Sequence, residues 1–464
     1  MAAGEARETV DVAIVGGGLS GLSAARRLRA GGRSVTVLEA RERVGGKMRT
    51  DTVDGHRADL GAHWIGPTQD RIAALARELG VRVERQHLEG KAVLASAGRR
   101  RTFSGSLPPL SPLSLAELGI LQLRLNRLRR RVSVEQPWVP AALTDWDAQT
   151  VDTFARRHLH TAGGRMFLNL ATELVFGAEP EELSLLYFLF YLQSGGGLDS
   201  LTEFEGGAQQ DHFVGGSQQL CDRLAEMLDG AVRLKSAVAA VEQHGDGVLL
   251  RTEDGSAIQA RHAIVAVSPA LAGRWHWARP LPADRDMLAQ RMPMGAYMKV
   301  VVAYDRAWWR DANLSGIAYA DAGPVQMVVD ASSRGAGGGL LACFITGRAV
   351  ERYGRLELGV RQAAVRETLS TLFGQRAGSW TAYAECDWTA EPYSRGGPVG
   401  LMGPGTLGRY GHVLRRPEGL VHWAGTDTAT VWNGYMDGAI QAGERAADEV
   451  LARCAAIPGS PSGQ

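Results

Sequence analysis

The sequence has little cysteine, no long apolar run and almost no excess charge, and each shortage excludes a class of protein. Four cysteines occur among 464 residues, without CxxC or zinc-ligand spacing, which argues against a disulfide framework and a metal site. A net charge of +1 gives no broad field for nucleic acid or an anionic membrane. No apolar stretch reaches about 18 residues, and residues 1–9 hold no apolar signal core. We therefore expect a soluble, cytoplasmic protein that binds neither nucleic acid nor membrane.

The remaining composition is that of an ordinary globular protein, with 45% hydrophobic and 22% charged residues. A chain of 464 residues is too long for a single hydrophobic core, so we expect two domains. Two short basic runs stand out, at 99–101 in a turn-like stretch and at 127–131 at the end of a Leu-rich helical pattern. We interpret both as solvated surface.

The N-terminal segment carries the pattern of a dinucleotide site. An apolar strand predicted over 10–15 runs into Gly16-Gly-Gly18-Leu-Ser-Gly21, a GxGxxG motif followed by apolar residues at helical spacing. A second predicted strand ends in Glu39, 18 residues past Gly21. Glycines let the backbone approach a pyrophosphate, the helix N-terminus offers N–H groups, and the acid accepts from a ribose hydroxyl. In this order the motif indicates a nucleotide cofactor.

A second glycine pair separates FAD from NAD as the predicted cofactor. Arg41-Glu-Arg-Val-Gly45-Gly46-Lys47 follows the acid at once, where an NAD domain would begin another helix. A diglycine flanked by cations is suited to a second close approach of phosphate. The order of the two loops favours FAD.

The segment Asp59-Leu-Gly61-Ala-His63-Trp64-Ile-Gly-Pro-Thr-Gln69 makes the pattern specific. Together with the GxGxxG and the diglycine, it resembles the flavin-dependent monoamine and polyamine oxidase family, whose chains open with this series. The resemblance runs from about residue 10 to about residue 452 and is weakest between 90 and 145. It implies an α/β fold, α+β overall, in which a Rossmann-like FAD-binding domain of discontinuous segments accompanies a substrate domain with a mixed sheet flanked by helices.

The resemblance also implies the domain boundaries. Residues 1–86, 213–289 and 391–455 are predicted to form the FAD-binding domain, 87–212 and 290–390 the substrate domain, and 456–464 a disordered tail. Within these ranges the apolar pattern predicts further elements. They are strands over 234–243, 248–253, 260–267, 297–304, 325–330 and 340–346, and helices over 183–192 and 435–454.

One cofactor residue departs from the family pattern. The family usually closes its diglycine with Arg, and Lys47 stands there instead; an ammonium is a point charge where a guanidinium grips phosphate with two donors. Trp388 either stacks near the flavin ring or belongs to the core. The cofactor contacts that the resemblance implies beyond the two glycine loops are Gly61, His63, Trp64, Val238, Trp388, Gly425, Thr426, Asp427 and Met436.

Lys299 is the first candidate for catalysis. It stands in Gly295-Ala-Tyr-Met-Lys-Val-Val-Val-Ala303, a strand that is otherwise apolar on both faces, and a buried ammonium is costly unless it is paired or functional. In the family a lysine here holds a water against flavin N5 and assists the reaction with oxygen. The alternative is an edge-strand lysine that reaches solvent.

Tyr435 is the second candidate. It matches one of two aromatic residues that flank the amine in the family, and the helix beginning there would point its positive end at the flavin pyrimidine. Gly397 stands where the family often has a cysteine linked to FAD, so non-covalent FAD is expected. Pro398 stands where the second aromatic residue is usual, so one side of the aromatic sandwich is open.

Most substrate positions implied by the resemblance are apolar, and no carboxylate matches a position deep in the pocket. A polyamine would need acidic partners, so a monoamine or a bulky apolar amine is favoured. His63 is unusual beside Trp64 and is either a proton acceptor or amine contact, or a satisfied structural histidine. The implied lining residues are Trp64, Leu174, Val175, Gln209, Met327, Phe344, Pro398 and Tyr435.

These residues predict an FAD-dependent oxidase of small, mostly apolar amines. The α-hydrogen would pass as hydride to flavin N5, water would convert the imine to an aldehyde or ketone, and O2 would be reduced to H2O2. Two alternatives stay open: a flavin desaturase or dehydrogenase of a non-amine, and a non-catalytic FAD-stabilised scaffold. The sequence does not fix the oligomeric state, and a homodimer is compatible with it.

Overall fold

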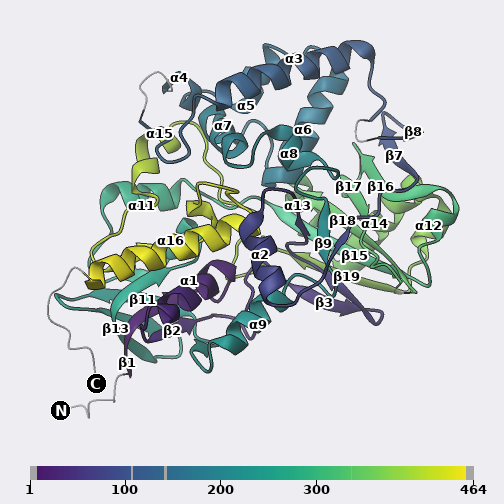
Figure 1. The fold of residues 1–464 in the computed structure, drawn as a ribbon. Coiled ribbons are helices and arrows are strands. Elements are labelled where there is room, and N and C mark those ends of the chain that lie inside the picture. The colour runs from purple at the N-terminus through teal and green to yellow at the C-terminus, as the bar shows by residue number, and fades with distance from the viewer. Residues whose placement is uncertain (1–7, 106–107, 140–143, 336, 456–464) are drawn as a thin grey trace. The chain divides into compact units, whose positions relative to one another are not determined.

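The computed structural model describes residues 8–105, 108–139, 144–335 and 337–455 (Figure 1). The chain divides into two compact units, each assembled from segments far apart in the sequence. The first unit comprises 1–46, 220–292 and 409–464, and the second comprises 47–219 and 293–408. The predicted disordered tail, 456–464, lies outside the described residues.

The units differ in extent from the predicted domains. Three segments were predicted to lie in the FAD-binding domain but belong to the second unit: 47–86, 213–219 and 391–408. Strand pairing explains part of this difference, because β5 (Trp64–Ile65) and β6 (Val83–Arg85) both pair with β9 (Asp211–Phe213). The assignment of cofactor and substrate contacts to domains stays a prediction.

An eight-stranded sheet forms the centre of the first unit, in the order β10-β2-β1-β13-β12-β11-β14, with β20 also paired to β13. The strands β10, β2, β1, β13 and β20 run parallel, as in a Rossmann-like fold. The strands are β1 (Glu8–Val15), β2 (Val35–Leu38), β10 (Val232–Arg233), β11 (Val238–Gln243), β12 (Val248–Thr252), β13 (Ala257–Val265), β14 (His276–Trp277) and β20 (Val421–Trp423).

Two helices of the first unit, α1 (Leu19–Ala30) and α16 (Met436–Ala455), pack against each other (Figure 1). A Cβ on Gly443 would collide with the carbonyl oxygen of Ser20, so the helices approach at a glycine. The remaining helices are α10 (Pro269–Ala272) and α11 (Ala283–Gln290), with 3-10 turns η3 (Gly411–Val413) and η4 (Thr426–Thr428). Two helices, α9 (Gln219–Met227) and α15 (Leu407–Tyr410), each span a unit boundary.

The second unit has a mixed seven-stranded sheet in the order β19-β15-β18-β17-β16-β7-β8. Its one parallel pair is β16 with β7. The strands are β7 (Lys91–Ser96), β8 (Arg99–Phe103), β15 (Tyr297–Tyr304), β16 (Leu314–Ala320), β17 (Met327–Asp330), β18 (Gly339–Thr346) and β19 (Ala382–Asp387), and a hairpin is formed by β3 (Thr50–Val53) and β4 (His56–Asp59).

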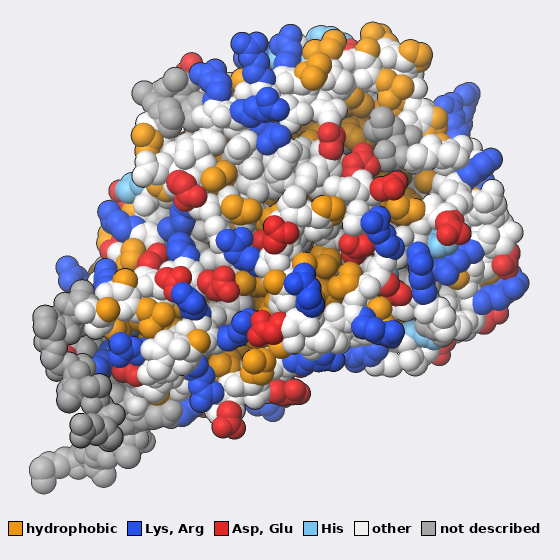
Figure 2. All heavy atoms as spheres, viewed as in Figure 1, with side chains coloured by type: hydrophobic (Ala, Val, Ile, Leu, Met, Phe, Trp, Pro, Cys, Tyr) orange, Lys and Arg blue, Asp and Glu red, His pale blue; other side chains and the backbone are white. Residues whose placement is uncertain are grey.

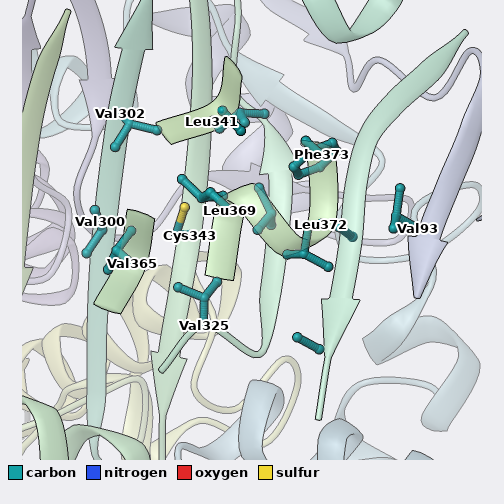
Figure 3. Close-up of a cluster of buried hydrophobic side chains, with 14 of the residues drawn as sticks. Val93, Val300, Val302, Val325, Leu341, Cys343, Val365, Leu369, Leu372 and Phe373 are labelled. Atoms are coloured by element: carbon teal, nitrogen blue, oxygen red, sulfur yellow. The ribbon is translucent and has the colours of Figure 1, made fainter. Parts of the chain in front are cut away.

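Helices flank this sheet, and α14 (Leu358–Phe373) covers one face. Figure 3 shows Val365, Leu369 and Leu372 of α14 packed on the strands that carry Val300 and Leu341. The other helices of the unit are α2 (Asp70–Glu78), α3 (Pro112–Arg129), α4 (Thr144–Asp147), α5 (Val151–Arg156), α6 (Ala162–Phe176), α7 (Leu185–Ser194), α8 (Leu198–Thr202), α12 (Trp308–Asp311), α13 (Arg348–Tyr353) and the 3-10 turn η2 (Gln375–Gly378).

One local prediction is wrong. The basic run 99–101 lies in strand β8, not in a turn, because its backbone pairs with β7 while its side chains stay exposed. The run at 127–131 does follow the predicted helical pattern, since α3 ends at Arg129. Figure 2 shows basic and acidic side chains interspersed over the visible face. None of the helices in the described ranges is long and apolar enough to cross a membrane.

Candidate functional site

The glycine turn after β1 leaves little room for a side chain at Gly16 and Gly21. Gly16 has φ +107°, and a Cβ on Gly21 would collide with the carbonyl oxygen of Gly16. Gly18 caps α1 without a side-chain hydrogen bond, and the first turn of α1 contains no acidic residue. The positive end of this helix is therefore suited to an anion such as a pyrophosphate.

Glu39 lies against this turn at the end of β2 and is 3% exposed. Its Oε2 accepts from the backbone N–H of Gly17 at 2.7 Å, and its Oε1 accepts from the N–H of Arg41 at 2.9 Å. The Arg41 guanidinium lies 3.7 Å from the same carboxylate. These contacts fix the acid at the C-terminal edge of the strand, and its expected bond to a ribose hydroxyl stays a prediction.

The predicted second glycine loop lies beside the first. Gly45 has φ +105°, and its N–H donates to the carbonyl of Gly17 at 2.9 Å. A Cβ on Gly46 would lie 3.3 Å from the Cα of Gly18. The Arg43 guanidinium donates to the carbonyls of Val44 and Gly46, which holds the loop in place. Two turns of bare backbone thus face each other, and an FAD pyrophosphate fits this arrangement better than any side-chain ligand set.

The C-terminal motif returns to the same unit. Gly425 has φ +89° and donates its N–H to the Ser20 hydroxyl at 2.9 Å. The Thr426 hydroxyl donates to the carbonyl of Tyr435 at 2.8 Å, so this turn fixes the residue just before α16. The ring of Tyr435 lies edge-on to Trp432, with centroids 5.0 Å apart. The helix predicted over 435–454 is observed as α16 over Met436–Ala455.

Lys299 is buried in the second unit. Side chains alternate along β15, so Met298, Val300 and Val302 face α14 while Lys299 lies on the opposite face. Lys299 is 1% exposed, and its Nζ donates to the carbonyl of Gly61 at 3.2 Å. The alternative of an edge lysine that reaches solvent is therefore excluded.

Two aromatic rings lie beside the Lys299 ammonium. Its Nζ is 5.4 Å from the centroid of Trp64 and 5.3 Å from that of Phe344, within cation–π range. The two rings are 5.6 Å apart. Met327 and the partly buried Leu174 pack in the same hydrophobic cluster. Four predicted lining residues thus meet on one face of the sheet.

A chain of buried polar side chains continues from this cluster. His63 Nδ1 lies 2.8 Å from Asp59 Oδ2, and the His63 ring stacks on His212 with centroids 5.0 Å apart. His212 Nε2 lies 3.5 Å from Glu84 Oε1. His63 is 7% exposed, and its Nε2 has no hydrogen-bond partner among the described residues. His63 is thus satisfied at one nitrogen only.

Burial dominates the electrostatics of this group. It lowers the pKa of Lys299 to about 8, against the opposite effect of the Asp59 charge. Burial and the nearby Lys299 lower the pKa of His63 to about 4, although Asp59 acts to raise it. Burial would raise the pKa of Asp59, but the His63 bond and the Lys299 charge bring it below its usual value. At neutral pH the group therefore holds an anionic Asp59, a neutral His63 and a mostly cationic Lys299.

Two residues that depart from the family pattern lie together. The Lys47 ammonium donates to the carbonyl of Pro398 at 2.5 Å. A Cβ on Gly397 would meet only Lys47 Cδ, at 3.6 Å. Trp388 is 3% exposed and donates its indole N–H to Leu60, so it is an anchored core residue. Its stacking on flavin stays a prediction.

The remaining predicted site residues have contacts within the chain that do not by themselves indicate a ligand. Gln209 donates its amide to the carbonyl of Leu201 at 2.9 Å. Val175 lies partly exposed on α6, next to Leu174. Val238 begins β11 at an irregularity of the strand register, and Asp427 is 3% exposed in η4. Their contacts to cofactor or substrate stay predictions.

Sequence reasoning missed three members of the buried chain: Asp59, His212 and Glu84. The spacing of Asp59 and His63 was the available signal, because a carboxylate four residues before a histidine in a tight loop can reach it. No sequence signal marks His212 and Glu84, which meet through the pairing of β9 with β6. No group of His, Cys, Asp and Glu in the described part of the chain is arranged to hold a metal, and none of the four cysteines forms a disulfide.

The sheet order and the facing glycine turns define a dinucleotide-binding protein of the Rossmann-like α/β class. Residues 19–451 match the family of flavin containing amine oxidoreductases. A Mycobacterium tuberculosis relative named as a flavin-containing monoamine oxidase is 37% identical over 444 residues, covering 96% of this chain and 97% of the relative. Flavin-containing amine oxidase A of Sus scrofa is 34% identical over 456 residues, covering 97% of this chain and 86% of that enzyme.

Solved structures give the same result. Wild-type putrescine oxidase bound to putrescine superposes with a TM-score of 0.92 at 30% identity, covering 96% of this chain and 99% of that one. Cyclohexylamine oxidase from Brevibacterium oxydans IH-35A gives 0.90 at 31% identity, with the same coverage. The chain belongs to the flavin-containing amine oxidoreductase family. It is a flavin-dependent amine oxidase with FAD as cofactor.

Proposed function

We propose that this enzyme oxidises small, mostly apolar monoamines to imines, which water hydrolyses to aldehydes or ketones, with O2 reduced to H2O2. FAD held by the glycine turns at Gly16–Gly21 and Gly45–Gly46 would supply the redox chemistry, hydride acceptance and electron transfer to oxygen. The chain's own side chains bind and orient the amine, exclude water and place charge. The observation that carries the proposal is the Lys299 ammonium held over Trp64 and Phe344 in an apolar cluster.

Lys299 is proposed to serve the reaction with oxygen. An ammonium at 1% exposure is maintained against a large desolvation cost, and a structural role would be met equally well by an apolar side chain of that length. A fixed positive charge stabilises negative charge that develops when oxygen is reduced. Tyr435 is proposed to guide the amine with its ring, in keeping with its anchored position before α16.

FAD is proposed to be held without a covalent bond. Gly397 stands at the position that carries the linking cysteine in some relatives, and it offers no sulfur. The backbone-lined turns at Gly16–Gly21 and Gly45–Gly46 then provide most of the binding through hydrogen bonds to phosphate.

A monoamine is favoured over a diamine on charge. The charged group that lies against the Trp64 and Phe344 rings is a cation, so a second ammonium on the substrate would be repelled there. A carboxylate in the place of this cation would instead attract the second ammonium of a diamine. Glu173, beside Leu174, carries only part of a negative charge at neutral pH, because burial and the neighbouring Glu179 raise its pKa to about 7.

The experiment compares three substrates: an n-alkylamine, an α,ω-diamine of the same chain length, and cyclohexylamine. The rate of oxidation of each is measured from the release of H2O2. We expect kcat/KM to be about tenfold or more higher for the monoamines. A preference for the diamine would overturn the monoamine assignment, and oxidation without stoichiometric H2O2 would overturn the oxidase assignment.

A further inference from the structure

The loop of residues 59–63 is fixed to its surroundings at every peptide. The backbone N–H of Leu60 donates to the carbonyl of Arg49, and the N–H of Ala62 donates to the carbonyl of Lys47. A Cβ on Gly61 would collide with the carbonyl of Lys47, so the backbone approaches the turn that follows the diglycine too closely for a side chain. Three side chains donate to the carbonyls of the three middle residues of the loop: Trp388 to Leu60, Lys299 to Gly61 and Ser217 to Ala62.

Asp59 begins this loop and is held as a carboxylate. Its Oδ1 accepts from the Thr50 hydroxyl at 2.5 Å and from the Ser217 N–H at 2.9 Å. Its Oδ2 accepts from His63 Nδ1 at 2.8 Å. The side chain is 1% exposed, and donors on both oxygens favour the ionised form over the protonated form. A fixed negative charge is therefore buried a few residues from the carbonyl that Lys299 contacts.

His63 is fixed in turn by its neighbours. Its ring lies edge-on to Trp64 at 4.7 Å and flat on His212 at 5.0 Å. The anionic Asp59 selects the tautomer with the proton on Nδ1, which leaves Nε2 with a lone pair. His63 therefore adds a donor to the carboxylate and no charge of its own.

Few other ionisable groups surround Lys299 among the residues that the structure describes. On β18 its neighbour is Phe344, and on β19 it is Cys386, whose sulfur lies 3.6 Å from an Arg49 nitrogen. From the 59–63 loop it contacts the carbonyl of Gly61, and Asp59 and His63 lie two residues to either side of that carbonyl, with His212 of β9 stacked on His63. Asp59 supplies the negative charge of this loop, since Arg49 is cationic and burial lowers the pKa of both histidines, while the carboxylate of Glu84 lies 3.5 Å from His212.

We propose that Asp59 is the buried counter-ion of Lys299 and that His63 is the positioning residue that holds this counter-ion in place. The pair thereby sets the pH range in which Lys299 carries its charge. The kinetic part of the test rests on the proposed role of Lys299 in the reaction with oxygen; the counter-ion relation itself does not.

The direction of the pH effect follows from burial. Desolvation lowers the pKa of Lys299 to about 8, and the charge of Asp59 opposes that fall. Without the carboxylate the pKa must drop further, so Lys299 would lose its proton at a lower pH. Attraction between the two side chains exists only while Lys299 is protonated, and it must disappear as pH rises through and above about 8.

A double-mutant cycle of Asp59→Asn and Lys299→Met tests this on FAD-saturated enzyme. The measured quantity is the unfolding rate constant in concentrated urea, which requires no reversibility. At pH 6.5 we expect a coupling of about tenfold or more in the rate, falling towards onefold at pH 10. Asp59→Glu is the matched control that keeps the charge and should keep the pH-dependent coupling. Coupling that is absent, or equal at both pH values, would overturn the proposal.

A second cycle covers the case in which Asp59→Asn does not fold. His63→Leu removes the donor to the carboxylate, whereas His63→Asn retains an amide donor at a similar place. In a cycle with Lys299→Met, we expect the coupling of His63→Leu to be smaller than that of Asp59→Asn and to disappear likewise at high pH. We expect His63→Asn to show little coupling. Equal coupling for Leu and Asn would refute the positioning role of His63.

The kinetic arm separates this inference from the proposed function. In the wild type we expect flavin reoxidation by O2 to slow as pH rises through about 8, and in Asp59→Asn to slow at a pH about one unit or more lower. If the unfolding coupling is present but this profile does not move, the counter-ion stands and the oxygen role of Lys299 fails. If the coupling is absent, the counter-ion proposal fails whatever the kinetics show.

Discussion

The two units contribute different kinds of interaction. In the first unit the candidate cofactor residues act through backbone: Gly16, Gly21 and Gly46 leave space, and Glu39 is used to fix a turn. In the second unit the candidate site is made of side chains, with an ammonium, a carboxylate and aromatic rings buried together. Backbone sites are sensitive to added volume, whereas buried charged sites are sensitive to altered charge. This difference can be tested from either side.

The largest effect is expected from added volume in the first unit. In Gly21→Ala the new Cβ would collide with the carbonyl of Gly16, so the turn cannot keep its shape. We expect purified protein without bound flavin after desalting, with far-UV circular dichroism unchanged. Gly245→Ala is the control, because nothing lies within 4 Å of its added Cβ. Full flavin content in Gly21→Ala would show that this turn does not depend on its glycine.

Denaturation tests whether the first unit's contacts are sufficient without a covalent link. Because Gly397 has no thiol, acid or heat should release all of the yellow colour into the supernatant. Absorbance of supernatant and washed precipitate gives the partition. Flavin that stays with the precipitated chain would mean that another residue is bonded to FAD.

Altered charge in the second unit should act on one half-reaction. Lys299→Met keeps the length of the side chain but removes the ammonium, so we expect reoxidation by O2 to slow about 100-fold while reduction by amine changes much less. Stopped-flow absorbance measures the two rates separately. The control is Lys235→Met, since that lysine is 69% exposed in its side chain and pairs with Glu42 at the surface. An unchanged oxidative rate in Lys299→Met would remove the charge from the mechanism.

The smallest expected effect is a shift along the pH axis. Only the neutral amine has the lone pair that hydride loss requires, so the reductive rate constant should rise with pH through one ionisation below the pKa of the free amine. That ionisation should move when amines of different basicity are compared. A fixed ionisation near pH 8 would point to Lys299, because the pKa of His63 is held at about 4.

Much of the first unit was predictable from the sequence, because its determinants are local. The order of strand, GxGxxG, helix, strand and acid lies within the first 39 residues, and β1, α1 and β2 appear where the apolar pattern indicated. The strands over 297–304, 325–330 and 340–346 were predicted for the same reason and appear as β15, β17 and β18. The run 99–101 was misjudged because strand formation there depends on pairing with β7 and not on side-chain pattern.

The second unit's polar group could not be predicted as a group. The sequence marked Lys299 as costly to bury and His63 as unusual, and those properties belong to single residues. The group brings together residues up to 240 positions apart in the sequence, from Asp59 to Lys299. The pairing of β5 with β9 places His212 beside His63, and the carbonyl of Gly61 contacts Lys299. Local sequence determined the glycine turns because steric room is decided by neighbouring residues. Tertiary structure decided the charge state of the buried group, because desolvation and Coulomb attraction depend on which distant segments surround each side chain.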